Sequence, residues 1–160
     1  GYTGKWIGHK GNYFEGGVRV PAIITYPREL PQGEVRHQAV TVMDWMPTLI
    51  DLIGLPKPSA KLDGRTMISV INNPTAPTQH PVLHFDWQDK WAVREGNWKL
   101  IRNYDDDSLE LYDMSKDLSE KSNLADKRPK IATRLNRGLS QWLKETDAPM
   151  PRPAKPLPKK

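Results

Sequence analysis

The second half of the chain groups its hydrophobic residues into short runs of the length that is typical of strands. Four short runs rich in β-branched and aromatic residues occupy residues 82–87, 90–94, 98–104 and 108–114. Turn-forming residues separate the second run from the third and the third from the fourth, which favours hairpins. The runs therefore predict an antiparallel meander of four strands.

A longer apolar period follows these predicted strands. Between about residues 128 and 145, apolar side chains recur every three or four positions, which predicts one amphipathic helix. We expect this helix to cover the open face of the sheet. Its apolar stripe is then core packing rather than a binding site, and it consists of Ile131, Leu135, Leu139, Trp142 and Leu143.

The first half of the chain has a more irregular pattern. Residues 1–17 are rich in glycine, which suits a loop whose backbone must approach another group closely. Residues 18–26 are β-branched and largely apolar, so we expect a buried strand there. Residues 45–53 have helical spacing, and Asp44 can cap the first turn of that helix. Residues 57–81 carry only short apolar runs and are expected to form a long connection.

The charge of the chain argues against a nucleic-acid partner. The formal net charge is +5, but four basic residues and no acidic residue lie within residues 152–160. The rest of the chain therefore carries a net charge of only +1, whereas a nucleic-acid binder should have a basic stripe on a folded face. Because prolines interrupt residues 148–160, we interpret this basic segment as a solvated tail.

Two further features of the composition limit the chemistry of this chain. It contains no cysteine, which excludes disulfides, thiolate metal sites and a cysteine nucleophile within these residues. No apolar run approaches the roughly 18 residues that a membrane span requires, so no such span is expected.

The most suggestive candidate for chemistry is Lys10, which lies among glycines. Glycine lets the backbone approach a ligand, and an ammonium offers three donors and a full charge to an oxyanion. An exposed loop lysine without a ligand fits the same residues. A phosphate loop does not fit the neighbouring GYTGKW, residues 1–6, because it has neither the four-residue spacer nor a Ser or Thr after its lysine, Lys5.

The residues around Lys10 resemble a known family. Residues 8–27, GHKGNYFEGGVRVPAIITYP, are similar to the segment of type I sulfatases in which Gly-x-Lys-Gly, three variable residues and Glu-Gly-Gly-x-Arg-Val-Pro lead into a core strand. These enzymes belong to the alkaline phosphatase superfamily. Further similar segments follow in the order that the family has, at residues 40–56, 63–64, 91–101 and 110–125.

The resemblance implies an α/β fold for the chain. Residues 1–79 are expected to be the C-terminal end of the sulfatase catalytic domain. Residues 80–147 are expected to form a small antiparallel sheet packed on a C-terminal helix, and residues 148–160 a tail rich in proline and lysine.

The resemblance also implies a reaction and candidate site residues. The whole enzyme would hydrolyse a sulfate ester, for example on a sulfated carbohydrate, to sulfate and an alcohol or phenol. Lys10 matches the lysine that contacts the sulfate group and is the candidate catalytic residue. His9, where family members often have glycine, and His84, on a predicted strand of the second subdomain, are candidate substrate-binding residues.

The family's cofactors are not matched by residues of this chain. Type I sulfatases use a formylglycine nucleophile and one bound calcium ion, and neither the nucleophile motif nor the metal ligands occur here. We therefore expect the rest of the catalytic domain to lie upstream and the present chain to be inactive by itself. The resemblance suggests a periplasmic or secreted protein.

Three residues near Lys10 have predicted structural roles. Glu15 is expected to anchor the loop by accepting hydrogen bonds from the backbone or from Arg19. Gly16 and Gly17 are expected to allow close packing or positive φ angles.

Three other functions are compatible with the residues. A phosphate or phosphonate ester hydrolase of the same superfamily would also use a lysine, because an ammonium does not distinguish these oxyanions. A non-catalytic module could hold a sulfated glycan through the loop or the basic tail. The chain could also act only as a packing partner for another domain.

Overall fold

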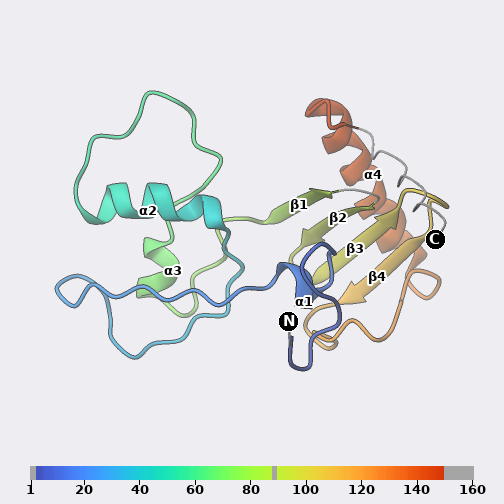
Figure 1. Cartoon of the computed structure of the whole chain (residues 1–160), viewed down its shortest axis with the longest axis horizontal. Coiled ribbons are helices and arrows are strands. Elements are labelled where there is room, and N and C mark those ends of the chain that lie inside the picture. The colour runs from blue at the N-terminus through green and yellow to red at the C-terminus, as the bar shows by residue number, and fades with distance from the viewer. Residues whose placement is uncertain (1–2, 88–89, 150–160) are drawn as a thin grey trace, which may run out of the picture. The chain divides into compact units, whose positions relative to one another are not determined.

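The computed structural model describes residues 3–87 and 90–149 and is shown in Figure 1. Its internal contacts divide the chain into two compact units. The first unit joins the chain up to Val20 with the chain from Val82 onward, and the second unit is Pro21–Pro81. The predicted domain boundaries concern a longer protein and stay predictions. The expected tail lies outside the described residues from residue 150 onward.

The first unit is built on an antiparallel sheet, as its sequence predicts. Its strands are β1 (Val82–Trp87), β2 (Lys90–Glu95), β3 (Trp98–Asn103) and β4 (Leu109–Asp113). They lie in the order β1-β2-β3-β4, and every neighbouring pair is antiparallel, which confirms the meander. Gly96, with a φ angle of +56°, forms the turn between β2 and β3.

One face of the sheet is covered by the predicted amphipathic helix, α4 (Pro129–Glu145) (Figure 1). Side chains alternate between the two faces along each strand, so Leu100 of β3 points to α4 and its neighbour Ile101 to the other face. The core under α4 is apolar, and its fully or nearly fully buried members are Trp91, Val93, Leu100, Leu111, Ala132, Leu135 and Leu139.

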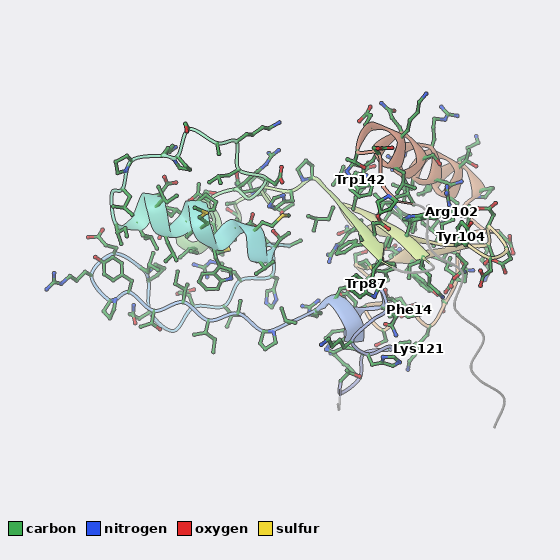
Figure 2. All side chains as sticks on the ribbon, turned by 45° about the horizontal axis from the view of Figure 1, so that its top comes forward. Phe14, Trp87, Arg102, Tyr104, Lys121 and Trp142 are labelled. Carbon is green, nitrogen blue, oxygen red and sulfur yellow. The ribbon has the colours of Figure 1, made fainter. Side chains whose placement is uncertain are left out.

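The opposite face of the sheet carries the loop that contains Lys10. Tyr13 and Phe14 of this loop pack with Ile101 of β3 and Tyr112 of β4. The hydroxyl of Tyr13 also donates a hydrogen bond to the carbonyl of Trp87, at the end of β1, at 3.1 Å. In Figure 2, Phe14 and Trp87 lie on the α1 side of the sheet and Trp142 lies on α4. The sheet is therefore the scaffold on which the loop packs.

The strand expected at residues 18–26 is absent from the described residues. Instead, α1 (Glu15–Val18) is a single helical turn, and the residues after it have no regular structure. Val20 is 76% exposed and Ile23 is 87% exposed, so neither is buried. A strand needs neighbours that satisfy its backbone N–H and carbonyl groups, and the described chain places no strand beside this segment.

The second unit contains the helix predicted at residues 45–53, which the structure places at α2 (Trp45–Leu52). A short 3₁₀ helix, η1 (Val42–Asp44), precedes it. The long connection expected at residues 57–81 is interrupted by one further helix, α3 (Ile68–Asn72), which the sequence did not reveal. No helix among the described residues is sufficiently long and apolar to cross a membrane.

The predicted cap at Asp44 has a different role. Its carboxylate does not cap α2; it accepts the backbone N–H groups of Thr41 at 2.7 Å and of Arg65 at 2.8 Å. It also lies 2.7 Å from Nε2 of His80, whose side chain is only 8% exposed. Burial opposes ionisation of Asp44, but these three partners lower its pKa below the ordinary value of 3.8. Asp44 therefore joins three separate segments of the second unit.

Candidate functional site

The glycine-rich loop folds into a compact turn around Lys10. Gly8 and Gly11, on either side of it, have φ angles of +91° and +99°, in the left-handed region that favours glycine. The backbone N–H of Gly16 donates to the carbonyl of Ile7 at 2.8 Å and closes the loop at its base. The backbone thus turns tightly at the position of the candidate catalytic lysine.

Lys10 and His9 are both exposed on this loop. Nδ1 of His9 lies 2.9 Å from the carbonyl oxygen of Lys10, so the imidazole can donate to the backbone of the loop itself. The Lys10 ammonium has no hydrogen-bond or ion-pair partner within residues 3–87 and 90–149. Its positive charge is therefore available to an anion, as a sulfate-binding role requires.

Close packing explains the two adjacent glycines that follow. A Cβ on Gly16 would lie 2.5 Å from the carbonyl oxygen of Gly8. A Cβ on Gly17 would overlap the carbonyl oxygen of Asn12 and lie 2.6 Å from that of His9. These backbone atoms belong to the Lys10 loop, so the first of the two predicted roles, close packing, is confirmed for both glycines.

Replacement of Gly17 by alanine is expected to destabilise the protein by about 1–3 kcal/mol, the usual cost of overpacking. The backbone oxygens that the new methyl group meets cannot move without opening the loop. Thermal unfolding of the variant measures the loss. Gly138→Ala is the matched control, because Gly138 lies inside α4 with nothing within 4 Å of an added Cβ, and alanine there should stabilise the helix by about 1 kcal/mol. Equal effects of the two substitutions would contradict this explanation.

Glu15 anchors the loop, and it does so with more partners than the sequence indicated. Its carboxylate accepts from Arg19 at 3.2 Å, as predicted, and from Nζ of Lys99 on β3 at 3.0 Å. The same Lys99 ammonium lies 2.7 Å from Oε1 of Glu120. In turn, Oε2 of Glu120 accepts the backbone N–H of Glu15 at 2.5 Å. We call Glu15, Lys99 and Glu120 the charge triad.

The charge triad is almost completely removed from solvent. Its three residues are between 1% and 3% exposed. Burial opposes ionisation of Glu15, but the ammonium of Lys99 and the guanidinium of Arg19 hold the pKa of Glu15 below the ordinary 4.5. For Glu120 burial prevails, and its pKa is raised above 4.5 although Lys99 acts in the opposite direction. The two carboxylates therefore differ in how readily they carry a charge.

His84 lies on the other side of the sheet from the Lys10 loop. Its ring stacks on Trp142 of α4, with centroids 4.6 Å apart and an interplanar angle of 1°. Burial lowers the pKa of His84 below 6.5, which favours the neutral ring. The structure does not bring His84 together with Lys10, and its substrate-binding role stays a prediction.

The calcium ion implied by the resemblance finds no site in the described part of the chain. Within residues 3–87 and 90–149, no three His, Asp or Glu side chains converge as metal ligands. The carboxylates of Glu15 and Glu120 are both paired with the Lys99 ammonium. The side chains that the structure describes therefore do not fit a calcium site.

Comparison with known families identifies the chain. A model of the family described as N-sulphoglucosamine sulphohydrolase, C-terminal, matches residues 5–147, which include both the Lys10 loop and the sheet. A sulfatase of Formosa agariphila is 32% identical over 168 aligned positions, which cover 88% of this chain and 30% of that protein. The chain therefore belongs to the sulfatase family and corresponds to its C-terminal portion. It spans about a third of the length of this relative.

Solved structures share the fold. A structure from work on glycosaminoglycan metabolism by Bacteroides thetaiotaomicron aligns with a TM-score of 0.70 at 23% identity, over 88% of this chain and 32% of that one. A protein in complex with its substrate D-glucosamine-2-N,6-O-disulfate aligns with a TM-score of 0.62 at 25% identity. That alignment covers 79% of this chain and 28% of the solved one. The expected α/β fold class is confirmed.

Proposed function

We propose that this chain is part of an enzyme that hydrolyses a sulfate ester, in which the ammonium of Lys10 contacts the sulfate group. The observation that carries the proposal is the exposed ammonium of Lys10, which has no partner among the described residues. Its loop is closed by backbone hydrogen bonds and is bound at its base to buried charged side chains. Membership of the sulfatase family supports it. The remaining catalytic groups, including the nucleophile and any metal ligands, would come from the part of the protein outside this chain.

An ammonium at this position would act through electrostatics. As the bond between sulfur and the leaving oxygen breaks, negative charge shifts toward the leaving group. A donor already aimed at the sulfate oxygens stabilises that charge without reorganisation during the reaction. In the closely related transfer of phosphoryl groups, catalysis rests mostly on such positioning and charge stabilisation. Lys10 would thus bind the sulfate group and lower the barrier for its transfer.

A sulfated carbohydrate is the substrate class that we favour. The support is the similar solved protein whose own substrate is a disulfated glucosamine. A sugar sulfate and an aryl sulfate present the same tetrahedral anion to Lys10, so the contact that we propose does not depend on the leaving alcohol.

Parallel assays of the full-length protein with an aryl sulfate and an aryl phosphate test this function. We expect a higher kcat/KM for the sulfate, because the matching family model and relative are sulfatases. Higher efficiency with the phosphate would favour the phosphate ester hydrolase instead. Activity with neither ester, combined with retention of the protein on a sulfated-glycan column, would favour a binding module.

A further inference from the structure

The charge triad has an arrangement that stability alone does not explain. Two carboxylates and one ammonium are buried together, and a second cation, the partly exposed Arg19, pairs with Glu15. Desolvation of charged groups is costly, and buried ion pairs can often be replaced by apolar residues without loss of stability. A buried network of this kind does, however, fix positions, because each charged group tolerates few alternative geometries.

The position that the charge triad fixes is the base of the Lys10 loop. Glu15 opens α1 five residues after Lys10, and both its carboxylate and its backbone N–H are held by the other two members. The next residue, Gly16, donates its N–H to Ile7 on the incoming side of the loop. The outgoing side of the loop therefore contains a member of the charge triad, Glu15, and the incoming side is hydrogen-bonded to the residue next to it.

The backbone of Glu120 supports a positioning role. Its φ angle is +52°, a left-handed conformation that is unfavourable for a residue with a Cβ. Such strain persists where the surroundings determine the position of a residue, and it is concentrated at functional sites. Here the conformation aims the carboxylate of Glu120 at the N–H of Glu15 and at Lys99.

We infer that Lys99 and Glu120 are positioning residues of the sulfatase site, which hold the Lys10 loop in place through Glu15. The inference rests on the proposed contact between Lys10 and the sulfate group. It makes the antiparallel sheet a direct support of the site, because Lys99 lies on β3. A displacement of Lys10 by about 1 Å would be sufficient to reduce turnover strongly, since such misplacement can cost about 100-fold.

A double-mutant cycle in the full-length enzyme tests the inference. Glu120→Gln keeps an oxygen that can accept from Glu15 but removes the charge that pairs with Lys99. We expect kcat/KM for a sulfate ester to fall about 10- to 100-fold, mainly in kcat. In an enzyme that already carries Lys10→Ala, the same substitution should change kcat/KM less than about 2-fold, because a group that acts through Lys10 has nothing left to position.

Two comparisons keep a structural effect separate from a positioning effect. Glu95→Gln removes an ion pair with Arg134 on the α4 side of the sheet. Because Glu95 contacts no described part of the Lys10 loop, this variant should leave kcat unchanged. Glu120→Asp retains the buried charge but shortens its reach by one methylene. It also suits the positive φ angle, so this variant should fold even where Glu120→Gln does not.

Several outcomes would overturn the inference. Equal losses in the Lys10 and Lys10→Ala backgrounds would show that Glu120 acts on the fold and not through Lys10. Wild-type kcat in both Glu120 variants would show that the loop holds its position without the charge triad. If instead Lys10→Ala alone retained full activity, the proposed function would fail, and that result is visible in the first variant of the cycle.

Discussion

Replacement of Lys10 by alanine in the full-length protein is expected to lower kcat/KM for a sulfate ester about 100- to 1000-fold, the range measured for loss of a single oxyanion donor. The variant should fold normally, because the side chain is exposed and makes no hydrogen bond or ion pair within the described residues. Surface substitutions of this kind change the free energy of unfolding by less than about 0.5 kcal/mol. Steady-state kinetics and thermal unfolding of the same preparation measure both effects.

Lys5→Ala is the matched control for this prediction. Lys5 is an exposed lysine of the same glycine-rich segment, and its ammonium lies 4.9 Å from the ring centroid of Trp6. Its removal takes away the same charge at a position outside the Gly-x-Lys-Gly motif, so kcat/KM should stay near the wild-type value. A similar loss in both variants would indicate a general effect of positive charge on substrate attraction. Wild-type activity in Lys10→Ala would rule out the proposed contact.

Patterns that depend on local sequence predicted the sheet and both longer helices. The strand-length apolar runs of β2 and β3, which are buried on both faces, and the helical spacing of Leu135, Leu139 and Trp142 reflect the periods of regular elements. Such periods are imposed by the geometry of the element itself, and so they can be read without knowing what lies opposite. The Lys10 loop was found differently, through the resemblance of its residues to a family motif.

Features that depend on distant partners were not predictable in the same way. The sequence analysis missed Lys99 and Glu120. Of the two, Lys99 was the easier to predict, because alternation of side chains along β3 places it on the same face as buried Ile101. A charged residue at an inward position indicates a buried partner, although the sequence does not say which one. Glu120 gave no such signal, since it lies in a polar turn, and its contact with Glu15 spans 105 residues.

The strand predicted at residues 18–26 is wrong for a related reason, because a strand also depends on distant partners. Its composition suits the interior of a sheet, and Val20 and Ile23 are the kind of residue that a sheet would bury. Composition expresses only a preference for burial, whereas a strand also requires backbone partners. Because the chain covers 30% of the length of its Formosa agariphila relative, we propose that residues outside this chain provide those partners in the whole protein.

Replacement of Lys99 by methionine is expected to produce the largest loss of stability, about 3–5 kcal/mol at neutral pH. Methionine approximates the volume of the lysine but leaves two carboxylates buried side by side without a counter-charge. Lys116→Met is the control, because the ammonium of Lys116 is exposed and lies 3.9 Å from Asp113, and surface pairs contribute less than about 1 kcal/mol. Thermal unfolding of both variants and the wild type would measure the difference.

The loss caused by Lys99→Met should depend on pH with a definite sign. In the wild type, Lys99 helps to hold the pKa of Glu15 below 4.5, so this stabilising contribution is present above pH 4.5 and lost as the pH falls through the lowered pKa. The pKa of Glu120 is already raised by burial, so the folded state binds this proton more tightly than the unfolded state does. Without Lys99 both carboxylates should resist ionisation in the folded state. The destabilisation should therefore be largest near pH 7 and should shrink as the pH approaches 4.5. A loss of stability that does not change with pH would mean that lost packing, and not unpaired charge, is the cause.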